Sequence, residues 1–100
     1  MRLKVLERHL RGSQLFIPLG AASFIVVVAS DGTHARQGEI AAFVSNGRQG
    51  VNYHRGVWHH PLLALDAPTD FLVVDSTADD NCEEVALPAT LQIVLTASPS

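Results

Sequence analysis

Phe24-Ile25-Val26-Val27-Val28-Ala29 is the stretch of the sequence that most clearly indicates one type of secondary structure. The run is continuously apolar and rich in β-branched residues, which pack well on a pleated surface and favour strands. Ser30-Asp31-Gly32 follows at once, and these residue types are typical of a turn. We therefore expect a buried strand over residues 24–29 that ends in a turn.

Short segments of the same kind recur along the chain, at spacings of about 8–12 residues and with turn residues between them. The expected strands are residues 3–9, 13–19, 24–29, 40–45, 51–53, 57–59, 62–65, 71–75, 82–87 and 90–95. Asn46-Gly47 favours a hairpin turn, Pro88 separates the last two strands, and residues 33–43 are also compatible with a short helix. Many short strands with glycine and proline turns indicate an all-β sandwich or barrel.

The composition of the 100-residue chain fits one globular domain. Apolar residues make up 47% and charged residues 17%, which excludes disorder of the whole chain. The formal net charge is -3 and the seven Lys and Arg residues form no basic stripe, so we expect no nucleic-acid partner. The expected domain covers residues 1–96, followed by a flexible tail over residues 97–100.

Neither a disulfide scaffold nor a membrane segment is expected. Cys82 is the single cysteine, so it forms no internal disulfide, and without a cation beside it we expect a packed thiol. The apolar run from Leu15 to Ala29 follows a basic amino end, as in a signal peptide, but Pro18 and Gly20 interrupt it. It is also shorter than the roughly 20 residues that span a bilayer. We expect a cytoplasmic protein without a membrane partner.

The first candidate site lies in Glu7-Arg8-His9-Leu10-Arg11-Gly12-Ser13-Gln14. Residues i and i+2 of a strand face the same side, so Glu7 and His9 are expected to point together. Gln14 comes after a turn at Gly12 and returns toward the same space on a neighbouring strand. A carboxylate, an imidazole and an amide oxygen together suit a divalent metal ion. The alternative is a half-exposed strand with ordinary charges.

The second candidate site contains three histidines, His54, His59 and His60, within seven residues. The spacing is not the i, i+4 pair of a helical metalloprotease. On a regular strand His59 and His60 point to opposite faces, so one faces inward while the other packs, hydrogen-bonds or meets a partner chain. Trp58 beside them is expected to fill the core or an interface. The alternative is a polar strand whose histidines have ordinary hydrogen-bond partners.

Both clusters resemble the metal-binding elements of the cupin barrel. His54-Arg55-Gly56-Val57-Trp58-His59 is similar to the P-x-G-x-x-H element, with His54 in the place of the proline. The resemblance makes His59 the matched metal-binding histidine. The first cluster resembles a degenerate form of the H-x-H element, in which Glu7 replaces the first histidine, His9 matches the second, and Gln14 replaces the glutamate that follows.

A longer and more specific resemblance is to the ureidoglycolate lyase family. The matching strings run in family order from residue 3 to about residue 87: Leu6–His9, Gly12–Leu19, Gly50–Tyr53, Trp58–Leu65, Asp70–Asp75 and Asn81-Cys82. Family members are dimeric cupins associated with nickel or another divalent ion, and they carry a substantial segment before the position of Leu3. The resemblance thus implies a cupin-like jelly-roll barrel, all-β and incomplete, and a homodimer that completes it.

The resemblance also implies an activity, the cleavage of ureidoglycolate to glyoxylate and urea. It implies metal ligation by Glu7, His9, Gln14 and His59, with His54 or His60 as the proton carrier. Arg8 or Arg55 would bind the substrate carboxylate, and Tyr53 would hydrogen-bond the ureido group. The alternative is a non-catalytic cupin-like module that binds a small acid or only dimerises.

Overall fold

A computed structural model of the chain describes residues 2–29, 40–65, 69–92 and 94. Eight strands form within these residues: β1 (Arg2–His9), β2 (Gln14–Pro18), β3 (Phe24–Ala29), β4 (Ile40–Val44), β5 (Val51–Tyr53), β6 (His59–Ala64), β7 (Phe71–Val74) and β8 (Cys82–Gln92). The expected tail over residues 97–100 lies outside the described residues. So does most of the segment 33–43, of which Ile40–Phe43 is part of a strand.

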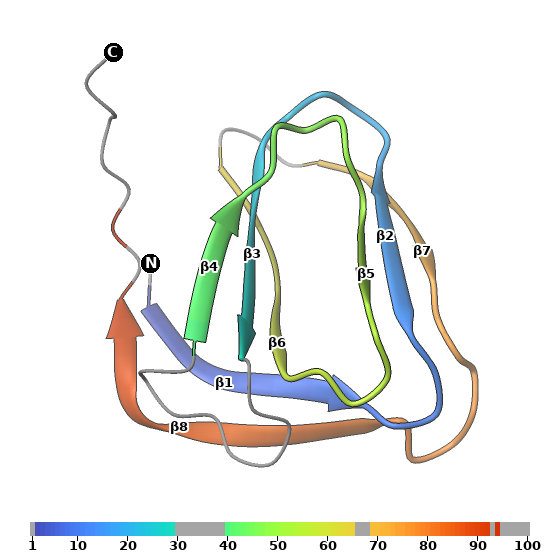
Figure 1. The fold of residues 1–100 in the computed structure, drawn as a ribbon, viewed down its shortest axis with the longest axis vertical. Coiled ribbons are helices and arrows are strands. Elements are labelled where there is room, and N and C mark those ends of the chain that lie inside the picture. Colours follow the sequence, from blue (N-terminus) through green and yellow to red (C-terminus); the bar gives the residue numbers. More distant parts are fainter. Residues whose placement is uncertain (1, 30–39, 66–68, 93, 95–100) are drawn as a thin grey trace.

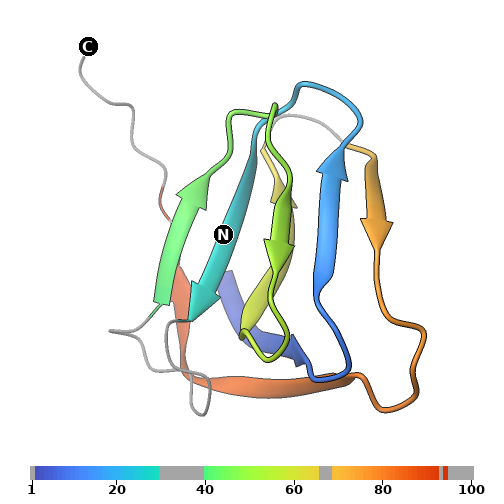
Figure 2. The same ribbon diagram turned by 45° about the vertical axis from the view of Figure 1, so that its right-hand side comes forward.

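The strands form two antiparallel sheets, one in the order β4-β3-β6-β1-β8 and one in the order β5-β2-β7. Figure 1 shows β1 and β8 crossing the lower end of the molecule beneath the more upright strands, and Figure 2 shows the same arrangement turned about the vertical axis. The prediction of an all-β, cupin-like fold is confirmed. The two sheets form an open sandwich, however, and not a closed barrel. Among the described residues, no helix is long and apolar enough to cross a membrane.

The run that predicted a buried strand is β3, and it is buried on both faces. Phe24 and Val26 pack with Tyr53 between the two sheets. Ile25 and Val27 face the other way and pack with Leu3 of β1. A strand covered on both sides needs apolar residues at every position, which explains why the sequence shows no alternation here.

Truncation of Phe24 should therefore destabilise the fold strongly. Its side chain is 1% exposed, whereas Phe43 on β4 is 58% exposed. We expect Phe24→Ala to lower the free energy of unfolding by about 3–5 kcal/mol, because it leaves a cavity in the core. Phe43→Ala is the matched control, with an expected change within about 0.5 kcal/mol. Denaturant unfolding of both variants measures the difference, and equal losses would contradict this placement of the core.

Two expected strand breaks are wrong, and both involve proline. Residues 59–64 form one strand through Pro61, where the register against β3 shifts by one residue. Residues 82–92 also form one strand through Pro88, where the register against β1 shifts between Leu3 and Val5. Proline lacks the N–H group that a regular ladder needs, and a bulge removes that need. Because β8 is also an edge strand, its Pro88 costs the sheet little.

The expected hairpin at Asn46-Gly47 is wrong as well. The turn leads from β4 in one sheet to β5 in the other, so the two strands do not pair. Gly47 has φ of 80°, and a Cβ atom at this position would lie 2.3 Å from the carbonyl oxygen of Ala21. Glycine is therefore required here both by the backbone conformation and by the close passage of another segment.

Candidate active site

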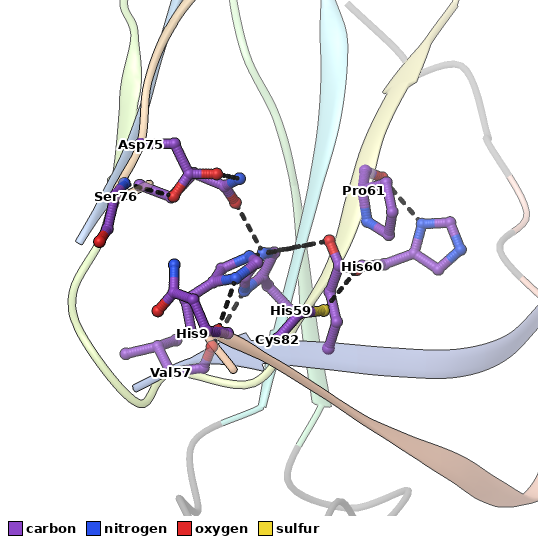
Figure 3. A network of polar contacts seen from close by, with 11 residues as sticks. His9, Val57, His59, His60, Pro61, Asp75, Ser76 and Cys82 are labelled. Carbon is purple, nitrogen blue, oxygen red and sulfur yellow. Dashed lines mark hydrogen bonds and ion pairs between the residues drawn. The ribbon is translucent and has the colours of Figure 1, made fainter. Parts of the chain in front are cut away.

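The cluster begins with the pairing of β1 and β6, in which Glu7 lies directly opposite His59. Partner residues of two strands point to the same face, and so does His9, two residues after Glu7. Nε2 of His59 lies 3.7 Å and Nε2 of His9 lies 3.9 Å from Oε1 of Glu7. The two imidazole rings lie side by side, with centroids 5.2 Å apart (Figure 3). The two histidines therefore share one space, although fifty positions separate them in the sequence.

The opposite sheet supplies the rest of the cluster. Gln14 begins β2 and Tyr53 ends β5, and these two residues are cross-strand partners. The Tyr53 ring stacks on His59 with centroids 3.9 Å apart, and Oε1 of Gln14 lies 3.2 Å from Nε2 of His59. Gln14 does reach the same space as Glu7 and His9, as the sequence indicated. It does so from the facing sheet and not from a strand beside β1.

Hydrogen bonds to backbone carbonyls fix the tautomers of both histidines. Nδ1 of His9 lies 3.2 Å from the carbonyl oxygen of Asn81, and Nδ1 of His59 lies 2.9 Å from that of Val57. A carbonyl oxygen only accepts, so in each ring Nδ1 carries the proton and donates it. In the neutral rings Nε2 then carries a lone pair, and both lone pairs face the cluster. Metal-binding histidines are commonly oriented in this way.

The Gln14 amide is oriented by a third residue. Its Nε2 donates to Oδ2 of Asp75 at 2.9 Å, so its oxygen is the end that faces His59. The 3.2 Å contact therefore brings two acceptors together when the His59 ring is neutral. Such a contact is favourable only with a cation between the two atoms. Burial lowers the pKa of His59, which argues against a proton as that cation.

A divalent metal ion fits this set of donors better than a proton does. Ligand atoms at about 2.1 Å from one ion lie about 3.0–4.2 Å from one another, and the distances of 3.2, 3.7 and 3.9 Å fall in this range. Glu7, His9 and His59 offer atoms that all lie within 4.8 Å of one another. Two nitrogens, a carboxylate and an amide oxygen are ligands that suit nickel, zinc and similar ions.

Two buried polar atoms of the cluster, Nε2 of His9 and the hydroxyl of Tyr53, have no hydrogen-bond partner within the part of the chain that the structure describes. Buried groups of this kind are rare because leaving them unsatisfied costs about 1–3 kcal/mol each. Burial, followed by the negative charge of Glu7, raises the pKa of Tyr53, so its phenol stays protonated. The cluster therefore offers one unused acceptor and one unused donor to a bound ion and ligand.

The buried, neutral His59 makes the stability of the metal-free chain depend on pH. Its pKa lies below the ordinary 6.5, mainly because of burial, while in the unfolded chain it is ordinary. The unfolded state thus takes up a proton near pH 6.5 that the folded state does not bind until lower pH. We expect the free energy of unfolding to fall as pH drops below 6.5, and to fall less in His59→Asn. Denaturant titrations with chelator on both sides of that pH test this, and parallel losses in both proteins would contradict it.

The other residues expected in the site lie outside this cluster. Arg8 is on the opposite face of β1, where its guanidinium binds Glu83 at 2.8 Å and covers the ring of Trp58. His54 and Arg55 are exposed in the turn before β6, which the Gly56 N–H ties to the His9 carbonyl. His60 points away from His9 and His59 (Figure 3). A surface pocket of about 220 Å³ is lined by Val5, Leu6, Glu7, His60, Pro61 and Glu84.

Sequence similarity to known proteins identifies the family of the chain. The family model described as ureidoglycolate lyase matches residues 1–94. The chain belongs to the ureidoglycolate lyase family. It is 50% identical over 100 residues to a protein named ureidoglycolate lyase from Pseudomonas syringae pv. tomato, covering 99% of this chain and 59% of that one. It is 52% identical over 96 residues to a protein of the same name from Pseudomonas aeruginosa, covering 95% of this chain and 57% of that one.

Glu7, His9 and His59 lie close together, as the sequence analysis expected, but several contacts of the cluster were not predicted from the sequence. Asp75 orients Gln14, and Asn81 orients His9. Cys82 was expected to be a packed thiol, yet it is exposed, and its Sγ lies 3.7 Å from Oε2 of Glu7. Alternation along β8 is the one feature that indicates this contact. Cys82 pairs with His9, and partner residues point to the same face of the sheet.

Proposed function

We propose that this chain carries the catalytic cluster of a ureidoglycolate lyase, which cleaves ureidoglycolate to glyoxylate and urea. Membership of the family supports the proposal, and the chain spans 59% of the length of its relative from Pseudomonas syringae. The observation that carries it is the gathering of ligand atoms of Glu7, His9 and His59 within 4.8 Å of one another, with the Gln14 oxygen 3.2 Å from His59. This arrangement is expected of a divalent metal site, and nickel is one candidate ion.

The substrate is a carbinolamide, in which one carbon bears a hydroxyl, a carboxylate and the ureido nitrogen. Cleavage removes the hydroxyl proton, forms the carbonyl of glyoxylate as the C–N bond breaks, and returns a proton to the departing urea. The chemistry that a bound divalent ion supplies here is a lower pKa of the substrate hydroxyl. Side chains around the ion must therefore bind the substrate and move one proton.

His60 is our candidate for the proton carrier. It lines the 220 Å³ pocket together with Glu7, so that pocket adjoins the metal cluster. Its Nδ1 donates to the carbonyl oxygen of Pro61 at 2.8 Å, which leaves Nε2 to accept a proton. An imidazole can both take the hydroxyl proton and return it to urea. His54 is the second candidate, in the exposed turn beside His9.

Two further side chains would bind the substrate. The buried Tyr53 hydroxyl has no partner among the described residues and would donate to the oxygen of the ureido group. For the substrate carboxylate we favour Arg55 over Arg8. Arg8 is already held by Glu83 on the other face of β1, whereas the turn that carries Arg55 is hydrogen-bonded to His9.

We also propose a cytoplasmic homodimer. Apolar side chains are exposed on β4 and β7, at one edge of each sheet: Phe43 at 58%, Val44 at 57%, Leu72 at 51% and Val74 at 55%. Open apolar edges tend to pair with another chain, and a second copy would cover them. Light scattering measures the mass in solution, and a strictly monomeric chain would contradict this part of the proposal.

A urea-release assay with ureidoglycolate, combined with metal analysis by mass spectrometry, tests the proposed activity. We expect one divalent ion per cluster and release of urea together with glyoxylate. Binding of a small carboxylic acid without release of urea would instead support the alternative, a cupin-like binding module. Neither metal nor turnover in a folded chain would overturn the proposal.

A further inference from the structure

The Gln14 amide can serve a metal site in only one of its two orientations. Its oxygen attracts a cation, whereas its NH₂ group repels one. The side chain is 8% exposed and lies between two partners, Asp75 on one side and His59 on the other. Rotation of the amide by half a turn exchanges the two ends while keeping the same shape. An interaction other than packing must therefore hold the Gln14 oxygen on the side that faces the cluster.

We propose that Asp75 is a positioning residue that holds the oxygen of Gln14 toward the metal cluster. The position of Asp75 follows from the fold, because Leu15 of β2 pairs with Val74 of β7, and Gln14 and Asp75 are the residues next to this last pair of the register. A carboxylate only accepts hydrogen bonds, so it binds the NH₂ end at 2.9 Å. Its negative charge also polarises the amide and makes the oxygen a better ligand. The inference rests on the proposed metal site.

A backbone contact makes the orientation of Asp75 itself definite. The N–H of Ser76 donates to Oδ1 of Asp75 at 2.8 Å (Figure 3). This contact leaves Oδ2 for Gln14. The substitution Asp75→Asn keeps the size of the side chain. Because the Ser76 N–H needs an acceptor, the new asparagine must place its amide oxygen at the position of Oδ1. The NH₂ group of the new asparagine then faces Gln14 in place of Oδ2. Gln14 has to turn its oxygen toward that group, and its own NH₂ then faces His59.

Asp75→Asn should therefore weaken metal binding more than complete removal of the side chain does. In Asp75→Ala the charge is lost, but the Gln14 amide is free to offer its oxygen to an ion. We expect Ni²⁺ affinity, measured by calorimetry, to fall about 10–100-fold in Asp75→Asn and clearly less in Asp75→Ala. Loss of charge alone would weaken binding equally in both variants, and that result would overturn the proposal.

A second substitution should rescue the first. In the double variant Asp75→Asn with Gln14→Glu, the new carboxylate accepts from the asparagine with one oxygen and offers the other to the ion. The charge of the pair is the same as in the native chain. We expect Ni²⁺ affinity to return to within about threefold of the native value, by the logic of a double-mutant cycle. A double variant no better than Asp75→Asn would count against the proposal.

Nuclear magnetic resonance of the metal-free chain tests the amide orientation without any ion. In Asp75→Asn the Gln14 NH₂ donates to Nε2 of His59, so a scalar coupling across this N–H···N hydrogen bond should appear between the two nitrogens. The native chain should show none. Absence of the coupling in a folded variant would overturn the proposal. If the coupling appears but the native chain binds no Ni²⁺, the proposed metal function fails while the assignment of Asp75 stands.

Discussion

His59→Ala should abolish both metal binding and release of urea. His59 is 1% exposed and is the point at which the cluster converges, since Glu7, Gln14 and the ring of Tyr53 all contact it. Loss of the His59 ring would remove one proposed ligand nitrogen. It would also remove the contacts that His59 makes with Glu7 and Gln14, two further proposed ligands. A bound ion contributes several kcal/mol to stabilisation of the transition state, so we expect the rate to fall on the order of 1,000-fold. Urea release and Ni²⁺ calorimetry measure the two losses.

A buried histidine also contributes to packing, so the fold of this variant has to be measured separately. Circular dichroism and thermal unfolding should still show a cooperative β protein, because the core formed by Leu3, Ile25 and Val27 contains none of the residues that contact His59. Asn52→Ala is the matched control, on the strand that carries Tyr53 but exposed, and it should keep native activity. Full activity of a folded His59→Ala variant would remove His59 from the mechanism.

The strands could be predicted from the sequence, but their partners could not. The apolar run of β3 and the alternation that joins Glu7 and His9 are local patterns, and both are confirmed. Pairing is decided by contacts between distant segments. The turn at Gly47 looks like a hairpin in the sequence, yet it crosses between sheets because Ala21 passes close to it. Pro88 looks like a strand end, yet the bulged edge strand tolerates it.

The same distinction applies to the site. His59 was found through the resemblance, and Gln14 through its place after a turn, because the residue types themselves suggest ligands. Asp75 carried no such signal, since an acidic residue after an apolar strand is usually a solvated turn. Its contact with Gln14 exists because β2 and β7 pair in one register across 61 positions. Residues that orient ligands are thus harder to predict than the ligands.

Removal of the metal should abolish the release of urea without unfolding the chain. We expect a chain treated with chelator to release no urea, and addition of Ni²⁺ or another divalent ion to restore release. The cluster is built from β1, β2 and β6, whose pairing does not require the ion, so the metal-free chain stays folded. Binding to the folded state alone should still add about 2.7 kcal/mol to its stability at 100 times the dissociation constant. Thermal unfolding with and without Ni²⁺ measures this gain.

The stabilising effect of the ion should depend on the four proposed ligands and on Asp75, which orients one of them. A bound ion would relieve the contact between the acceptors of Gln14 and His59, and it would occupy Nε2 of His9, which has no partner among the described residues. His9→Ala should therefore lose most of the thermal shift, because the ion loses a nitrogen ligand. Cys82→Ser is the matched control. The Cys82 thiol contacts the other oxygen of Glu7 but is not one of the four proposed ligands, so this variant should keep the thermal shift. Activity in a chain that mass spectrometry shows to be free of metal would contradict this mechanism, because the acceptor cluster would then have no role in turnover.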